Sequence, residues 1–456
     1  MSNSTVAVPY AEPPWLNGLP SAYYNESHRK WQKTVRAFVD RVMLPYAGDW
    51  EAAGDAPSSL YKTFADNNML IPNLSAPLPI EALKSIGIHE LPGGLKVEDY
   101  DYLHTSIYID EVNPPPFPPV HALSNAPKLA RCGTGGPAGS VTVGFAFGVP
   151  PIIKFGNKQL RDRFVAPLVT GKIRICIAIT EPGAGSDVAN IETTAVKSAD
   201  GKHYIVNGAK KWITNGIFSD YASMAVRTGG PGPGGLSLLV VPLKAQGVNM
   251  TRIHVGGGKA AGTTYIDLDD VKVPVENLIG TEGMGMLYIM QNFNHERLTI
   301  AIGVNRQSRV ALSAAFEYCL KREAFGKCLM DQPVVRHRLA KAGAVLESHY
   351  AWIEGIVYQM TKLNHADANR ELGGLTALAK AQAGLVMEQC ASTAVLLFGG
   401  NGYTQSGQGA NVERIYREIP GIRIPGGSED VMLDLSVRQM VKNFQKKLKD
   451  LDAAKL

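Results

Sequence analysis

The longest regular pattern of apolar and polar residues runs from about Met284 to Leu320. Apolar residues recur there at three- and four-residue spacing and no proline interrupts them, which predicts one long helix. Glu296 lies just before a stretch that is apolar almost all round, and Ile300 and Gly303 follow it on the same helical face. A carboxylate in such surroundings is costly unless it is paired or used in chemistry. Glu296 is therefore the first candidate for a reactive group, and Gly303 leaves space on its face of the helix.

The rest of the pattern gives helices, then strands, then helices again. Helical periodicity covers 25–43, 58–68, 97–111 and 139–171, and it returns at 334–364, 372–397, 411–418 and 428–451. Two-residue alternation predicts strands at 174–180, 221–227, 236–242 and 264–274, and two short strands within 203–216 joined by a hairpin at Asn207-Gly208. The long helix is expected to end within 322–327 at a glycine stop.

This order predicts an α+β multidomain chain. An N-terminal helical domain at 1–171 precedes a middle β-barrel or β-sandwich domain at 172–280 and a C-terminal bundle of four to five helices at 281–456. Prolines accumulate from about 71 to 120 and end in 113–119, a segment that can form neither a helix nor an internal strand. This insertion is either a rigid lid or a connector, and the connector is favoured.

Composition argues against several classes of protein. Apolar residues make up 45% and charged residues 19% of the chain, as in ordinary globular proteins, and polar or charged residues interrupt every candidate for a membrane span. The formal charge of +5 is not gathered in a basic block, so it does not indicate nucleic-acid binding. The five cysteines have no metal-type spacing and favour a reducing compartment.

Both ends of the chain were compared with known targeting signals, which determine where in the cell a protein is delivered. The first sixteen residues contain Glu12 and no arginine, unlike a secretory signal or a mitochondrial transit peptide. The last three residues, Ala454-Lys455-Leu456, differ by one small residue from the Ser-Lys-Leu peroxisomal address. We therefore expect the protein in the peroxisome, or otherwise in the cytoplasm, and not outside the cell.

Three glycine-bearing segments are candidates for holding a phosphate group or a flat ring: TEPGAGSD at 180–187, REAFGK at 322–327 and FGGNGY at 398–403. A further segment, KWITNG at 211–216, ends a neighbouring strand with an aromatic wall and a hydroxyl. Each alone is more often only a turn, but TEPGAGSD follows a strand and offers exposed backbone N–H groups to an anion or an acceptor-rich ring. No Gly-x-Gly-x-x-Gly sequence follows a strand and no Walker sequence occurs, so nucleotide binding by those routes is unsupported.

Together with DDVKVPVENLIG at 269–280, these segments resemble the acyl-CoA dehydrogenase flavoprotein family in kind and in order. The resemblance covers about 25–450. It implies helical, β-barrel and helical domains, with FAD extended between the barrel and the C-terminal bundle. It also implies an acyl-CoA substrate, and a homotetramer or at least a homodimer, because a neighbouring subunit completes the flavin site in this family.

The resemblance also implies roles for individual residues. Thr180 and Ser186 should line the flavin ring and the acyl-CoA, Trp212 should wall the ring, and Thr214 should hydrogen-bond near the reactive flavin nitrogen N5. The residues expected at the FAD pyrophosphate and adenine half are Arg322, Phe325, Gly399 and Gly400, with Gly427 and Ser428 suited to the phosphates at the start of the last helix. Ser186, Arg297 and Gly303 are expected on the substrate side.

The catalytic base departs from the pattern of most family members. They carry it as a glutamate at the position that is Gly426 here, and glycine cannot take a proton. The sequence NHERL at 294–298 is similar to the isovaleryl-type and long-chain-type members, which supply the acid from the long helix. The resemblance therefore implies Glu296 as base, with the backbone N–H of Gly426 holding the enolate oxygen. The alternatives are an ion pair of Glu296 with Arg297, and Glu429 as a second candidate for the base.

The activity expected is α,β-dehydrogenation of an acyl-CoA to the trans-2-enoyl-CoA. Because Gly426 and Gly303 leave volume near the reacting carbons, branched or medium-to-long acyl chains are expected. Electrons would pass to an electron-transferring flavoprotein or to oxygen. Two alternatives of the same fold remain: an acyl-CoA oxidase, although such enzymes usually have an extra C-terminal domain, and a nitroalkane oxidase-like enzyme. A DNA-associated relative would need a basic tail domain, which the sequence lacks.

Overall fold

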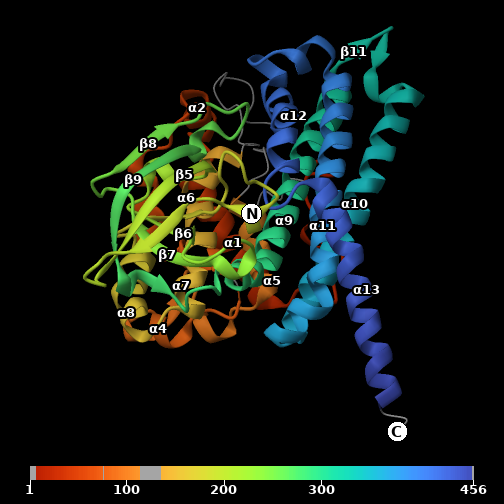
Figure 1. Ribbon diagram of the computed structural model, residues 1–456. Coiled ribbons are helices and arrows are strands. Elements are labelled where there is room, and N and C mark those ends of the chain that lie inside the picture. The colour runs from red at the N-terminus through yellow and green to blue at the C-terminus, as the bar shows by residue number, and fades with distance from the viewer. Residues whose placement is uncertain (1–6, 75, 113–134, 454–456) are drawn as a thin grey trace. The chain divides into compact units, whose positions relative to one another are not determined.

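The computed structural model describes residues 7–74, 76–112 and 135–453 (Figure 1). Its contacts divide the chain into two compact units, each assembled from segments far apart in sequence. The first unit comprises Met1–Gly48, Tyr102–Thr134 and Arg297–Leu456, and the second comprises Asp49–Asp101 and Gly135–Glu296. The proline-rich segment at 113–119 and the C-terminal Ala454–Leu456 lie outside the described residues.

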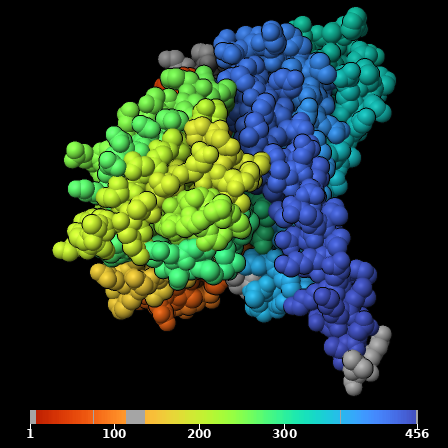
Figure 2. Space-filling view, viewed as in Figure 1, coloured from red at the N-terminus to blue at the C-terminus, as the bar shows by residue number. Residues whose placement is uncertain are grey.

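The first unit is almost wholly helical. Within it the central helix α11 packs against α10, α12 and α13, while α5 packs against both α1 and α10. The C-terminal half of α13 extends past the ends of the other helices of this unit (Figures 1 and 2). The elements are α1 (Glu26–Val42), α5 (Tyr102–Val112), most of α9 (Gly285–Lys321), β11 (Glu323–Ala324), β12 (Lys327–Cys328), α10 (Pro333–Lys362), α11 (His365–Phe398), α12 (Ala410–Arg423) and α13 (Glu429–Ala453).

The second unit is built on an eight-stranded sheet in the order β10-β7-β6-β4-β5-β9-β8, with β3 paired to β6 in parallel. Helix α6 packs on β3. The strands are β3 (Ile175–Ala178), β4 (Thr194–Lys197), β5 (His203–Ile213), β6 (Tyr221–Arg227), β7 (Leu236–Pro242), β8 (Val248–Arg252), β9 (Thr264–Pro274) and β10 (Leu278–Ile279). The remaining elements are α2 (Ala47–Ala53), α3 (Ser58–Asp66), α4 (Ile80–Ser85), the short strands β1 (Glu90–Leu91) and β2 (Leu95–Lys96), α6 (Gly135–Gly148), α7 (Pro150–Phe155) and α8 (Lys158–Val169).

The predicted succession of helices, sheet and helices is confirmed. Alternation along β9 places every second residue of its first half in a core shared by β3, β5, β6 and β7, as a half-buried strand requires. That core contains Cys176, Tyr204, Val206, Met224, Leu239, Val241, Ile266 and Val271.

The predicted hairpin at Asn207-Gly208 is wrong. Residues on both sides of this dipeptide pair with β9, so β5 is one strand. Between Val206 and Gly208 the single residue Asn207 faces two residues of β9, Asp269 and Asp270, so the bulge lies in β9. A Cβ atom at Gly208 would lie 2.7 Å from the Cα atom of Thr193, which explains why glycine is needed there. The dipeptide favours a turn locally, but pairing with β9 keeps the backbone extended.

Two helical stretches among the described residues are long and apolar enough to cross a membrane, Gly135–Phe155 and Ala366–Tyr403. Judged by helix length and hydropathy, the expectation that no stretch is long and apolar enough to span a membrane is wrong. Their most apolar windows are 72% and 50% buried inside the structure, as core helices of a globular protein also are.

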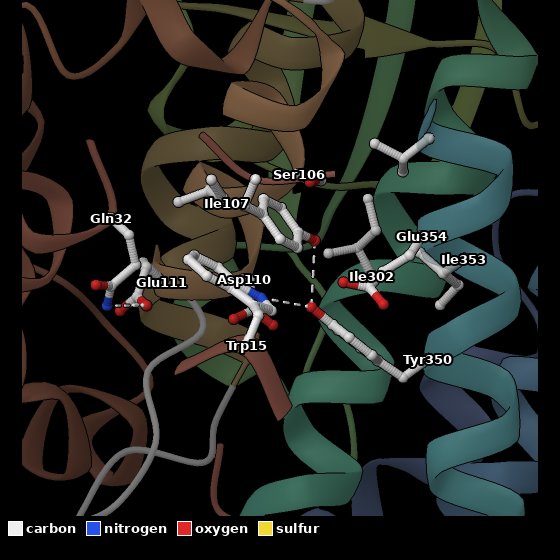
Figure 3. A pocket seen from close by; sticks show the side chains of 12 residues that line it. Trp15, Gln32, Ser106, Ile107, Asp110, Glu111, Ile302, Tyr350, Ile353 and Glu354 are labelled. Carbon is white, nitrogen blue, oxygen red and sulfur yellow. Dashed lines mark hydrogen bonds between the residues drawn. The ribbon is translucent and has the colours of Figure 1, made fainter. Parts of the chain in front are cut away.

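A buried ionic cluster fixes the N-terminal segment within the first unit. The guanidinium of Arg306 is fully buried; it donates to the carbonyl oxygen of Ala11 at 3.0 Å and pairs with Glu12 and Asp110. Beside this cluster, Trp15 Nε1 donates to the hydroxyl of Tyr350 at 3.0 Å (Figure 3). The small cavity here, about 20 Å³, has room for a water molecule but not for an acyl chain.

Acid should destabilise the first unit through His349. Its Nε2–H donates to the carbonyl oxygen of Ala379 at 3.0 Å and its Nδ1 accepts from Asn305 at 3.1 Å, so the neutral ring is fully bonded. Burial lowers the pKa of His349 from 6.5 to about 4. The unfolded chain therefore binds a proton that the folded chain excludes, and stability falls as pH drops from 6.5 towards 4, by about 2 kcal/mol at pH 5 for this group.

Denaturant unfolding at pH 7 and pH 5 measures this effect. We expect His349→Gln to lose less stability than wild type over this interval. His337→Gln, which changes an exposed histidine on the same helix, is the matched control. An unchanged pH dependence in His349→Gln would contradict the assignment.

Candidate active site

The second unit brings together the TEPGAGSD and KWITNG segments. TEPGAGSD begins where β3 ends, and KWITNG is the end of β5. The backbone N–H of Lys211 donates to the carbonyl oxygen of Thr180 at 2.9 Å, so the two segments lie side by side. Ser186 is exposed in the loop, and Thr180 and Thr214 are partly exposed.

A buried ion pair holds the TEPGAGSD loop. Glu181 accepts from the ammonium of Lys210 at 2.7 Å and from the backbone N–H groups of Glu192 and Thr193 at 2.6 and 3.0 Å. Burial lowers the pKa of Lys210 to about 8. Burial alone would raise the pKa of Glu181, but Lys210 and the hydrogen bonds outweigh it and keep that pKa low. The pair is thus ionised at neutral pH, and Glu181 has a structural role in the motif.

The side chain of Trp212 is exposed, and its backbone has a left-handed conformation that is rare for a residue other than glycine. Its φ is +64°, a bulge separates it from the regular pairing of β5 with β9, and its side chain is 52% exposed. Asn215, also at φ +64°, fixes the turn that follows: its side chain accepts from Gly144 N at 2.7 Å and donates to the carbonyl oxygens of Gly139 and Ala261 at 3.0 and 2.8 Å. Such conformations persist only where the surroundings impose them, and they often mark functional sites.

The first unit brings together REAFGK and FGGNGY through Tyr318. The ring of Tyr318 stacks on Phe398 with centroids 4.2 Å apart, and its hydroxyl accepts from Asn401 at 3.2 Å. The carbonyl oxygen of Tyr318 accepts from Arg322 N at 2.9 Å. Arg322 therefore lies beside the end of α11, where Gly399 and Gly400 have open space around them. Sequence reasoning did not identify Tyr318.

The expected glycine stop after α9 is in fact a hairpin. Strands β11 and β12 pair through Ala324 and Lys327, and the two residues between them, Phe325 and Gly326, have φ of +56° and +74°. Two positive φ values are typical of a tight type I′ hairpin turn. This turn leaves the Phe325 side chain 94% exposed.

The loop between α12 and α13 leaves no space for a side chain at Gly426. Its φ is +69°, and a Cβ atom there would lie 2.5 Å from Cδ1 of Ile300 on α9. The Cδ1 atom of Ile300 therefore lies where a side chain at this position would begin, and the free volume expected around the acyl chain stays a prediction. Gly427 (φ +91°) and Ser428 follow, and Ser428 leads into α13.

Helix α9 carries the remaining candidates. Glu296 is partly buried and precedes Ile300 by one turn on the same face, and Gly303 lies further along that face. Arg297 is 6% exposed. Glu429 is engaged elsewhere, because its carboxylate accepts from Arg423 Nε and Nη2 at 2.7 and 2.9 Å. Glu429 is thereby disfavoured as the base.

A helix–sheet–helix chain with an exposed, backbone-strained tryptophan beside a strand-end loop has the arrangement of a flavin-dependent dehydrogenase. Comparison with known proteins gives the same class. Sequence profiles described as acyl-CoA dehydrogenase, middle domain, and acyl-CoA dehydrogenase, C-terminal domain, match residues 176–271 and 283–441.

Individual relatives agree with the profiles. Acyl-CoA dehydrogenase apdG of Emericella nidulans is 62% identical over 451 residues, covering 99% of each chain. Acyl-CoA dehydrogenase AFT10-1 of Alternaria alternata is 35% identical, covering 96% of this chain and 97% of that one. The crystal structure of an acyl-CoA dehydrogenase from Geobacillus kaustophilus is 28% identical with a TM-score of 0.77, covering 92% of this chain and 100% of that one. The chain belongs to the acyl-CoA dehydrogenase family, and it is an oxidoreductase with FAD as cofactor.

Gly426→Ala should destabilise the first unit by about 2–4 kcal/mol, because alanine is strained at positive φ and its Cβ overlaps Ile300. Ile300→Val removes only the Cδ1 atom that makes the overlap. In that background we expect Gly426→Ala to cost only the backbone strain, about 1–2 kcal/mol. Denaturant unfolding of the four proteins measures the difference.

Gly421→Ala is the matched control, because a Cβ atom at this position in α12 meets nothing within 4 Å. It should not destabilise the unit, and it should stabilise it by up to about 1 kcal/mol because alanine is favoured over glycine within a helix. Equal costs of Gly426→Ala in both backgrounds would show that Ile300 does not limit this position.

Proposed function

We propose that this protein dehydrogenates an acyl-CoA thioester between its α and β carbons, with Glu296 as the base. The observation that carries the proposal is the closed position at Gly426. A side chain there would be strained by the left-handed backbone, and its Cβ atom would overlap the Cδ1 atom of Ile300 unless that methyl group moved. This favours an acid from another element, and Glu296 lies one turn from Ile300 on the same face of α9.

In the proposed reaction a side chain removes the proton and a backbone N–H stabilises the thioester oxygen. A thioester α-proton is far too weakly acidic for a carboxylate in water, so the base needs a desolvated position that raises its pKa. The partly buried Glu296, followed by the apolar residues from 298 onward, is suited to this. The N–H of Gly426 would hold the thioester oxygen as negative charge develops, since glycine retains that donor. Removal of the α-proton by Glu296 then accompanies loss of hydride from the β carbon.

The residues of the second unit fit the ring of a flavin. Trp212 offers an exposed aromatic face, Thr214 offers a hydroxyl two residues later, and no atom lies within 4 Å of a Cβ position at Gly183 or Gly185. When bound, FAD supplies a two-electron acceptor for the hydride. Thr180, Ser186, Trp212 and Thr214 would hold the ring, and Arg322, Phe325, Gly399, Gly400, Gly427 and Ser428 would hold the remainder of the cofactor.

We propose that the enzyme accepts branched or medium-to-long acyl groups. Ile300 is the residue proposed to determine this preference. Because the Cδ1 atom of Ile300 lies beside Gly426, we place the acyl chain further along α9, where Gly303 has no side chain. Ser186 and Arg297 are the polar residues proposed for the thioester and CoA side.

Glu296→Gln should bind FAD and lower the rate of flavin bleaching by about 10²–10⁴-fold, because it keeps the shape of the side chain but cannot accept the proton. Anaerobic bleaching with butyryl-, isovaleryl-, octanoyl- and palmitoyl-CoA measures the rate. Isovaleryl- or octanoyl-CoA should bleach the wild-type flavin faster than butyryl-CoA.

Glu429→Gln is the matched control, since this carboxylate is already paired with Arg423, and it should keep most of the wild-type rate. The double variant Glu296→Gln, Gly426→Glu should stay inactive, because Ile300 blocks the second position. Full activity of Glu296→Gln would rule out Glu296 as base, and failure of every acyl-CoA would favour a nitroalkane oxidase-like reaction. Mixing the reduced enzyme with oxygen or with an electron-transferring flavoprotein identifies the acceptor.

We also propose that the chain self-associates as a homotetramer or homodimer. Helix α13 carries apolar side chains at three- and four-residue spacing that are exposed within one chain: Leu433, Val437, Val441, Phe444, Leu448 and Leu451. Sedimentation velocity should show a dimer or tetramer, and Phe444→Glu should shift it towards monomer because a charge cannot be buried in that contact. Lys442→Glu, which changes charge on the same helix, is the control; a monomeric wild type would contradict the proposal.

A further inference from the structure

Lys380 on α11 is a buried cation whose contacts lead to the loop that contains Gly426. Its side chain is 2% exposed. The ammonium donates to the carbonyl oxygen of Gly427 at 2.6 Å and to that of Arg423 at 3.3 Å. An ammonium group is strongly hydrated, so placing it inside a protein is costly unless it makes such bonds.

The two acceptors bracket the loop between α12 and α13. Arg423 is the last residue of α12, and Gly427 lies two residues before Glu429, where α13 begins. Between them, Gly426 has no side chain with which to anchor itself, and glycine backbone has more conformational freedom than any other. The Cε atom of Lys380 lies 3.8 Å from the Cβ position at Gly426. The lysine therefore restricts a segment that its own sequence leaves loose.

The side chain of Arg423 supports the same anchoring. A Cβ atom at Gly384, one turn after Lys380 on α11, would lie 2.6 Å from Cγ of Arg423, so the arginine stem crosses α11 at a glycine. Its guanidinium is paired with Glu388 and Glu429. The side chain of Arg423 is thus paired with two carboxylates, while Lys380 donates to the backbone of the loop.

We propose that Lys380 is a positioning residue for the dehydrogenation: it holds the Gly426 N–H in place for the thioester oxygen and sets a positive charge beside the loop. This inference rests on the proposed function, because the oxygen it serves becomes negative only when the α-proton is removed. Donors fixed in advance at the site of developing charge stabilise the transition state more than the bound substrate. Loss of Lys380 should accordingly lower kcat more than it raises KM.

Lys380→Met tests the inference, because it keeps the apolar stem and removes both the charge and the donor. On the FAD-loaded enzyme we measure kcat and KM for the fastest acyl-CoA of the panel, deuterium wash-in at its α carbon in D₂O, and FAD content. Backbone hydrogen exchange at 424–428 and the melting temperature are measured with and without FAD. We expect α-carbon exchange to fall by about tenfold or more, with KM within about threefold of wild type, and faster backbone exchange in the loop even without FAD.

Cys390→Ala is the matched control, since it changes a fully buried residue of α11 that lies against α10 and not against the loop. It should lower the melting temperature without altering either exchange measurement. Lys380→Gln, which keeps a donor but no charge, is the second variant if Lys380→Met folds poorly. Its rate of α-carbon exchange should lie between those of wild type and Lys380→Met.

The outcomes separate the inference from the proposed function. If wild type exchanges the α-proton, Glu296→Gln does not, and Lys380→Met matches wild type, the inference is wrong and the proposed function stands. If activity in both Lys380 variants falls only in proportion to melting temperature and FAD content, as in the control, Lys380 has a structural role alone and the inference is wrong. If Glu296→Gln exchanges as fast as wild type, the proposed function itself is wrong.

Discussion

Ile300 and a side chain at position 426 would need the same space, and this exclusion underlies the proposed chemistry. A left-handed backbone and a Cδ1 atom 2.5 Å from the Cβ position leave glycine as the residue that fits without strain or overlap. Because the loop can present only its backbone, it can offer an N–H donor but not an acid. The acid is then assigned to α9, the same helix whose Ile300 closes the loop position.

Four of the segments proposed to hold FAD or the thioester are kept in place by a polar or aromatic contact with another part of their own unit. Glu181 and Lys210 hold the strand-end loop, Asn215 holds the turn after Trp212, Tyr318 joins the ends of α9 and α11, and Lys380 holds the loop between α12 and α13. Glycine-rich segments have little structure of their own. Their positions are therefore determined by other residues. Lys210, Tyr318 and Lys380 lie outside the glycine-bearing segments, and Glu181 and Asn215 lie within them but are buried.

Much of the candidate site could be identified before the structure, because motif order and spacing are properties of the sequence. Thr180 and Trp212, and likewise Arg322 and Gly399, were expected to serve one cofactor, and within its own unit each pair of segments is adjacent. Lys380 and Tyr318 gave no such signal, because a lysine or tyrosine within a long helix resembles many others. The contact of Ile300 with Gly426 gave no signal for a related reason: a glycine in a sequence does not reveal which neighbour lies beside it.

The sequence by itself predicted the order of helices, strands and helices and most of the longer elements, since periodicity and proline positions act locally. It also showed that position 426 lacks an acid while 296 has one. The tertiary structure decided what local preference could not. Pairing with β9 kept the Asn207-Gly208 dipeptide inside one strand, opposite a bulge in β9. Pairing of β11 with β12 turned an expected helix stop into a hairpin, and packing placed the Cδ1 atom of Ile300 beside Gly426. These outcomes depend on atoms contributed by residues distant in the chain, so they follow from packing and strand pairing.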